Sequence, residues 1–181
     1  HVLASAESIP AGDAGFDALL RSAFAFAEDN SHGTDAAYTN RAAILALSVI
    51  LAQERVAEVA RRPIDLGRIE EIRGLRNRIT LRGRNDLARH FWVSAGLVIV
   101  ADEGRAMTIG IGKELMDSTP GGSGFSFVDM MANRAGIMFA GAATGHATAA
   151  RGMQVRISRG VASDDLLPDI EGLPEGIPDA R

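Results

Sequence analysis

Hydrophobic residues recur along the first part of this chain at the spacing of an amphipathic helix. Large apolar residues and alanines stand at i, i+3, i+4 and i+7, so they share one helical face. A turn-rich stretch at residues 29–33 ends this segment, and Thr34 or Asp35 has the residue type that caps a second helix. The pattern predicts a first helix that buries Phe16, Leu19, Leu20, Ala23, Phe24 and Ala27.

The second helix is predicted to be the most buried element in the first half of the chain. Its residues 42–52 are apolar nearly all round, which is typical of a helix enclosed by others. Pro63 ends it, because proline disfavours helix at the residue before it. A shorter charged helix is expected at residues 64–75, and Gly83 marks a turn after a connector at 79–81.

Two more helices are predicted at residues 85–104 and 105–116. Asn85 or Asp86 is well placed to cap the first of them. The second contains two glycines, and each weakens a helix by roughly 1 kcal/mol relative to alanine. Glycines at these positions suggest close packing of the backbone against a neighbour.

A Gly-rich loop at residues 118–124 precedes the last predicted helix. Ser126 and Asp129 have the spacing of a capping box that opens a helix to about residue 143. The tail from residue 163 contains three prolines and two glycines, which exclude a regular element there. We expect this tail to be a surface strap or disordered.

These elements predict an all-α fold, a compact single-domain bundle of about five to seven helices with a Gly-rich loop and an irregular C-terminal tail. Apolar residues make up 46% of the chain, which is enough for one hydrophobic core. The predicted organisation is an extended N-terminal arm at residues 1–15, a helical domain at 16–162 and a Pro/Gly-rich tail at 163–181.

Charge and composition narrow the classes of partner. A formal net charge of −4 gives no broad attraction to phosphate backbones, so nucleic acid is not an expected partner. Arginines cluster between Arg61 and Arg89, but acidic residues stand among them, and we interpret the region as a solvated helix face. The absence of cysteine excludes disulfides and cysteine-ligated metals. No run of 18 uncharged apolar residues is present, so no transmembrane segment is predicted.

Polar residues form three pairs in the predicted helices of the second half. The members of each pair are three or four positions apart, so each pair shares one helical face. Side chains placed in this way can converge inside a bundle, as carboxylate and histidine ligands do in bundle metal sites. The pairs are Asp86 with His90, Glu114 with Asp117, and Asp129 with Asn133.

The apolar surroundings of some of these residues point to function. His90 and Glu114 are embedded in otherwise apolar segments, where a charge is costly unless it is paired. Buried ionisable groups that meet are candidates for a shifted pKa and for a functional role. A structural interpretation exists for each residue as well: Asp86 and Asp129 as helix caps, Glu114 and Asp117 as a solvated face, and His90 as a hydrogen-bonded core histidine.

Three motifs follow one another in this region. They are Asp86-x3-His90-x3-Ser94, then Gly112-Lys113-Glu114-x2-Asp117, then Phe125-Ser126-x2-Asp129-x3-Asn133-x2-Gly136. Their order resembles the YfiM-like family of predicted exported envelope proteins and, more distantly, the pattern in VanZ-like membrane proteins. The resemblance covers residues 86–136 and implies a helical fold and a cell-envelope location, without supplying a reaction. Together with a start at His1 in place of methionine, it leads us to expect a periplasmic or secreted bacterial protein. This start fits either a removed signal peptide or a trimmed chain.

The first functional hypothesis is an exported hydrolase that acts on an envelope or extracellular glycan or lipid. Glu114 would serve as general acid, Asp117 or Asp129 as base or nucleophile, and His90 would orient groups or relay protons. The residues expected to bind substrate or a partner are Lys113, Ser126, Asn133 and Asp86.

Two alternatives stay open at the level of sequence. In one, a divalent metal such as zinc, manganese or iron is held by His90, Glu114, Asp117 and Asp129. In the other, the chain is a non-catalytic scaffold or binding module, its polar cluster pins the helices, and the Gly-rich loop docks an envelope protein. The sequence does not predict the oligomeric state.

Overall fold

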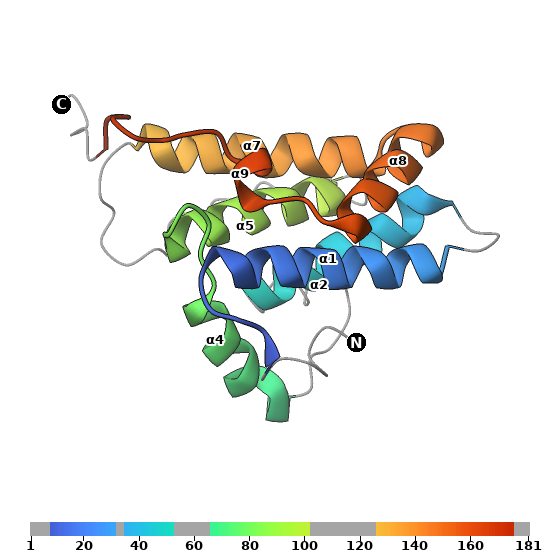
Figure 1. The fold of residues 1–181 in the computed structure, drawn as a ribbon, viewed down its shortest axis with the longest axis horizontal. Helices are drawn as coiled ribbons and strands as arrows, with labels where there is room; N and C mark the ends of the chain where they lie inside the picture. The colour runs from blue at the N-terminus through green and yellow to red at the C-terminus, as the bar shows by residue number, and fades with distance from the viewer. Residues whose placement is uncertain (1–7, 32–34, 53–65, 102–125, 176–181) are drawn as a thin grey trace.

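The described part of the chain folds into helices joined by short turns (Figure 1). The structure is a computed structural model, and it describes residues 8–31, 35–52, 66–101 and 126–175. The prediction of an all-α bundle is confirmed. In chain order the elements are α1 (Asp13–Asp29), α2 (Ala36–Leu51), the 3-10 turn η2 (Leu66–Arg68), α4 (Ile69–Arg78), α5 (Asn85–Ala101), α7 (Phe127–Thr144), α8 (Ala147–Arg159) and α9 (Ser163–Leu166).

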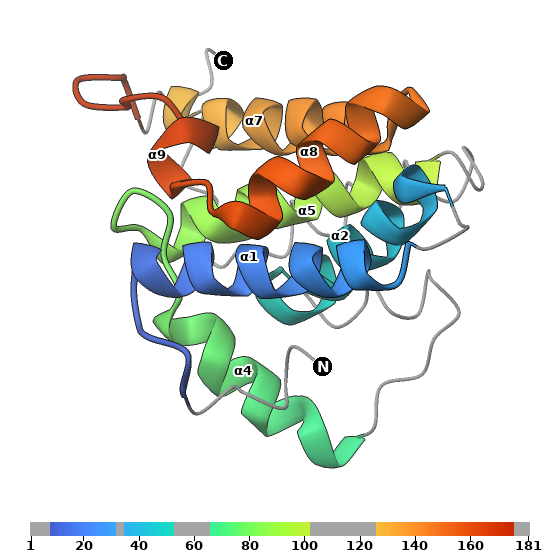
Figure 2. The same ribbon diagram turned by 45° about the vertical axis from the view of Figure 1, so that its right-hand side comes forward.

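Two helical hairpins, α1 with α2 and α7 with α8, pack together with α5. α1 and α2 form an antiparallel pair, and α8 runs back from the end of α7 to lie between α7 and α1 (Figure 2). α5 and α7 lie side by side and run parallel, because His90 is level with Asp129 and Asn133 while Phe91 and Ala95 lie against Gly136. α4 stands at the edge of the bundle, where it contacts α2 and α5.

Aromatic rings from three helices fill the centre of the core. Trp92 of α5 lies 5.7 Å from Phe16 of α1 and 5.9 Å from Phe139 of α7, measured between ring centroids. Phe91 lies 5.6 Å from Phe16 in an edge-to-face arrangement. Such pairs add stability beyond the burial of their surface, so this cluster fixes α1, α5 and α7 relative to one another.

The helix pattern and two caps expected from the sequence are present. The buried face of α1 contains every position that its apolar periodicity indicated, although the helix begins at Asp13 rather than Phe16. Asp35 caps α2 by accepting a hydrogen bond from the amide of Ala37 at 3.0 Å. Ser126 caps α7 by accepting one from the amide of Asp129 at 3.1 Å.

Two polar residues in the charged region have roles that the sequence analysis did not predict. Asn85 is the first residue of α5, and its Nδ2 donates to the carbonyls of Arg76 and Ile79, at 2.6 and 2.7 Å, and so closes the end of α4. Arg76 is buried, which corrects the interpretation of all these arginines as a solvated face. Its guanidinium donates to the carbonyls of Val49 and Ile50 in the last turn of α2, both at 2.9 Å.

The C-terminal tail is a strap that contains one regular turn. α9 lies within it, so the prediction that no regular element forms after residue 163 is wrong at this point. Leu167 is fully buried, and its carbonyl accepts from Nε of Arg82 at 2.9 Å. The amide of Phe127 donates to the carbonyl of Pro174 at 3.1 Å. The strap therefore ties the turn before α5 to the start of α7.

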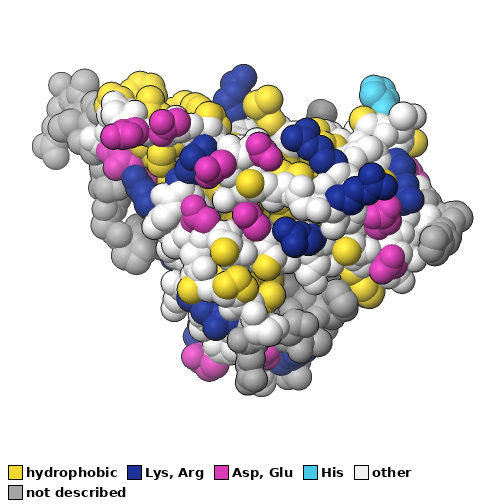
Figure 3. Space-filling view, viewed as in Figure 1, with side chains coloured by type: hydrophobic (Ala, Val, Ile, Leu, Met, Phe, Trp, Pro, Cys, Tyr) yellow, Lys and Arg dark blue, Asp and Glu magenta, His cyan; other side chains and the backbone are white. Residues whose placement is uncertain are grey.

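The surface of the described residues mixes charge and apolar groups. Acidic and basic side chains are interspersed on the face drawn in Figure 3, and hydrophobic side chains gather over the start of α7. The exposed apolar residues of α7 include Phe127, Met130, Ile137 and Met138. None of the helices in the described residues combines the length and apolar character needed to cross a bilayer. The predicted helix at 105–116, the loop at 118–124 and the predicted end of the second helix lie outside the described residues.

Candidate functional site

Four polar side chains meet between α5 and α7. His90 and Ser94 come from successive turns of α5, and Asp129 and Asn133 come from successive turns of α7. We call these four residues the His90 cluster. His90, Asp129 and Asn133 were predicted from the sequence to converge, and the structure brings them together. Ser94 belongs to the motif around His90 but was not expected at the site.

The close approach of the two helices creates this cluster. Gly136 lies against the backbone of Phe91, and a Cβ added to it would come within 2.1 Å of the Phe91 carbonyl oxygen. Only glycine permits helix axes to come so near at this point. Because the helices run parallel in this contact, Asp129 and Asn133 face the α5 turn that carries His90 and Ser94.

Hydrogen bonds fix the imidazole ring of His90. Nδ1 of His90 lies 3.2 Å from Oδ1 of Asn133, and the hydroxyl of Ser94 donates to the same oxygen at 2.9 Å. Because an amide oxygen only accepts, this contact is a hydrogen bond in the tautomer that carries its proton on Nδ1. Nε2 then faces Oδ2 of Asp129 at 3.6 Å. The ring is oriented at one nitrogen and presents the other to a carboxylate.

Asp129 has unused bonding capacity. Its Oδ1 is buried, and within the described part of the chain it has no hydrogen-bond partner. A buried carboxylate oxygen without a partner is uncommon, and it points to a proton, a water or a ligand at that atom. Asp129 takes part in the helix cap through its backbone amide, so its side chain is left to face His90. The side chains of His90 and Asp129 are 18% and 26% exposed, so solvent can reach the pair.

Two predicted binding residues lie at the start of their helices. Asp86 forms an ion pair with Arg84, with Nη2 and Oδ2 separated by 2.5 Å. Burial raises the pKa of the Asp86 carboxyl, but hydrogen bonds and charge from Arg84 outweigh it, so the net pKa lies below 3.8. Ser126 is nearly buried and acts as the cap of α7. Asp86 bonds to Arg84 and Ser126 bonds to the amide of Asp129, so these contacts are made with groups other than the His90 ring.

The remaining predicted site residues lie outside the described residues. They are Glu114, Asp117 and Lys113. Among the described residues no group of three His, Cys, Asp or Glu side chains is placed to hold a metal ion. The structure therefore supplies two of the four predicted metal ligands, His90 and Asp129, and the metal hypothesis stays a prediction.

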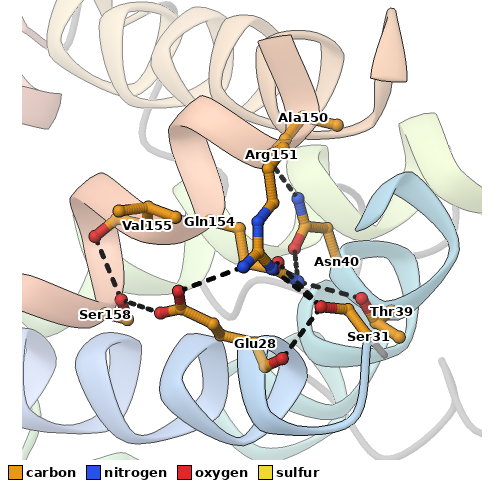
Figure 4. A network of polar contacts seen from close by, with 9 residues as sticks. All are labelled: Glu28, Ser31, Thr39, Asn40, Ala150, Arg151, Gln154, Val155 and Ser158. Atoms are coloured by element: carbon orange, nitrogen blue, oxygen red, sulfur yellow. Dashed lines mark hydrogen bonds and ion pairs between the residues drawn. The ribbon is translucent and has the colours of Figure 1, made fainter. Parts of the chain in front are cut away.

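A second polar network, which sequence reasoning missed, lies where α1, α2 and α8 meet (Figure 4). Asn40 and Gln154 at its centre are fully buried. Nε2 of Gln154 donates to Oδ1 of Asn40 at 2.9 Å, and Nδ2 of Asn40 donates to the carbonyls of Ala143 and Ala150 at 2.7 and 3.0 Å. The available signal was a lone amide, Asn40, in a helix that is otherwise largely apolar.

Charged and hydroxyl groups complete this network on its outer side. Nη1 of Arg151 donates to Oε1 of Gln154 at 2.7 Å and to Oγ of Ser31 at 2.8 Å. Glu28 accepts from Ser158 at 2.5 Å and lies 3.5 Å from Nη2 of Arg151. These donors and acceptors are paired with one another, so the network holds the helices together and offers no reactive group.

The fold and its polar clusters define the chain as an all-α helical bundle with a histidine–carboxylate pair between two parallel helices. Comparison with protein-family models, with curated proteins and with solved structures found no match.

Proposed function

We propose that this chain is a bacterial cell-envelope hydrolase in which His90 and Asp129 form the acid/base pair. The observation that carries the proposal is the placement of Nε2 of His90 opposite Oδ2 of Asp129, with Oδ1 of the same carboxylate buried and without a partner among the described residues. The envelope location comes from the resemblance of residues 86–136 to exported proteins.

The cluster has the parts that proton transfer needs. Asn133 and Ser94 hold the Nδ1 side of the ring, so the orientation of His90 and its protonated nitrogen are fixed. Nε2 and the Asp129 carboxylate can then take a proton from an attacking water and return it to a leaving group. Ser94 bonds to Asn133 rather than to His90, so these contacts do not make a Ser-His-Asp nucleophile. The proposal rests on His90 and Asp129 and does not depend on Glu114 or Asp117.

Incubation with two envelope substrates tests this function. Purified protein is mixed with peptidoglycan sacculi or with phospholipid vesicles, and released products are identified by mass spectrometry. We expect product from the wild type and a rate at least about 100-fold lower from Asp129→Asn, the size typical of lost acid/base catalysis. Asp29→Asn, at an exposed position in α1, is the matched control and should keep the full rate. Release of no product by the wild type, or equal release by Asp129→Asn, contradicts the proposal.

A non-catalytic binding module is the second candidate, and one observation favours it. His90 and Ser94 of α5 both bond to Oδ1 of Asn133 of α7, as expected for a cluster that pins α5 to α7. Among the described residues, the hollow between α1 and α2 and the hollow between α7, α8 and α9 are lined by residues outside the His90 cluster. This candidate predicts that His90→Ala lowers the melting temperature while partner binding at other surfaces persists.

A further inference from the structure

An apolar groove of about 410 Å³ lies between α1 and α2. Alanines line it from both helices: Ala23 and Ala27 of α1, and Ala42, Ala43 and Ala46 of α2. Because alanine side chains end at Cβ, the antiparallel helices leave space between them that larger side chains would fill. Unfilled apolar volume loses dispersion contacts, so the groove gains stability from an apolar occupant.

Two aromatic side chains flank the groove and are exposed. Phe26 is 47% exposed and Tyr38 is 66% exposed, although both are large and largely apolar. Both belong to the lining of the groove. Exposed apolar surface gathered around a hollow marks a binding site more strongly than single exposed residues do.

One basic side chain lies in the lining of the groove, which also contains the neutral polar side chains of Asn30 and Thr39. Arg68 of η2 is the one charged residue in the described lining. Its Nε lies 3.3 Å from Oε2 of Glu71, and its side chain is 47% exposed. A guanidinium has five N–H donors in a planar fork, so Arg68 can hold a second carboxylate while Nε stays paired with Glu71.

We infer that this groove binds one long-chain fatty acid, with the acyl chain over the alanines and the carboxylate on Arg68. A volume of 410 Å³ lies near the low end of the roughly 300–1,000 Å³ of ligand pockets, which suits one narrow chain better than two. The groove shares no lining residue with the His90 cluster, so this inference and the proposed function can fail separately.

Calorimetric titration with oleate tests the inference. We expect one molecule to bind per chain, and Arg68→Gln to weaken oleate about tenfold, as expected for loss of a charge-assisted hydrogen bond. Oleyl alcohol should bind the wild type and Arg68→Gln equally. Arg73→Gln is the matched control, because Arg73 also pairs with a glutamate three residues away in the same region, and it should leave oleate affinity unchanged. Absence of saturable binding, equal affinity of Arg68→Gln for oleate, or tighter binding of a lysophospholipid than of oleate overturns the inference.

The position of the acyl chain is tested with single cysteines, since the natural chain has none. Ala46→Cys places a thiol in the groove, and Ala142→Cys places one on the exposed face of α7. Cysteine is close to alanine in size, so both variants should fold. Oleate should slow the reaction of Cys-specific maleimide with Ala46→Cys and leave Ala142→Cys unaffected. Equal labelling rates of Ala46→Cys with and without oleate would show that the ligand does not occupy the groove.

Discussion

Gly136 of α7 lies so close to Phe91 of α5 that a Cβ on Gly136 would come within 2.1 Å of the Phe91 carbonyl oxygen. This contact sets the spacing of the two parallel helices that carry the His90 cluster. We predict that Gly136→Ala forces the helices apart and lowers the free energy of unfolding by about 1–3 kcal/mol, as overpacking of a core does. Denaturant unfolding monitored by the single tryptophan, Trp92, measures this change.

Gly141 provides the control for that substitution. It lies on the same helix, and nothing stands within 4 Å of an added Cβ. Gly141→Ala should raise the free energy of unfolding by up to about 1 kcal/mol, the usual difference in helix propensity. Equal effects of the two substitutions would contradict the close contact at Gly136.

The network around Asn40 should make a large contribution to stability. Asn40→Ala removes the donor to the carbonyls of Ala143 and Ala150 and leaves Gln154 without one of its acceptors. Each buried group left unsatisfied costs about 1–3 kcal/mol, so we expect Asn40→Ala to be strongly destabilising in denaturant unfolding. Asn30→Ala, at the exposed end of α1, should cost less than about 1 kcal/mol, because its lost hydrogen bond is open to solvent. Similar losses from both variants would argue against the network.

Asp86 should make stability depend on pH in the acid range. The pKa of its carboxyl is below 3.8 in the folded chain because of Arg84, so its stabilising effect is present above that value and is lost as pH falls through the lowered pKa. Burial raises the pKa of Asp17, so Asp17 has the opposite effect on the pH dependence of stability. Because Asp17 is present in both proteins, the difference in melting temperature between wild type and Asp86→Asn reports on Asp86. We predict that the wild type is the more stable of the two at neutral pH and that their melting temperatures converge in acid, as pH falls through the lowered pKa of Asp86. If the melting temperatures of the two proteins change with pH in parallel, the ion pair of Asp86 with Arg84 is not the cause of the pH dependence.

Asn133 should determine the tautomer of His90. Its Oδ1 accepts from Nδ1, so we expect nitrogen NMR of the ring to show a proton on Nδ1 in the wild type. Asn133→Ala removes that acceptor and should shift the proton toward Nε2, which faces Asp129. An unchanged spectrum in Asn133→Ala would mean that another group orients the ring.

Local signals in the sequence predicted helices where α1, α2, α4, α5 and α7 lie, with two of their caps, but did not predict α8. The apolar stripe of α1 and the caps at Asp35 and Ser126 depend on residues within one or two turns, so the sequence pattern was sufficient. The convergence of His90, Asp129 and Asn133 was also predicted, because helical spacing put each pair on one face.

Contacts between distant segments were not predictable in the same way. Gln154 and Asn40 are 114 positions apart, and no local pattern pairs them. Arg76 looked like one more surface arginine, since its buried partners are backbone carbonyls of α2 that the sequence does not mark. The carboxyl tail was expected to be a surface strap or disordered because of its prolines, and burial of Leu167 holds it on the bundle as a strap.

The most direct test of the His90–Asp129 pair is the rate of substrate hydrolysis by His90→Gln, Asp129→Asn and the double variant, with melting temperatures measured alongside. If the two side chains act as one acid/base unit, each single variant is at least about 100-fold slower than wild type and the double variant is no slower than the slower single one. All three variants should remain folded. Wild-type rates in either single variant, or independent and additive losses in the double variant, would contradict the account.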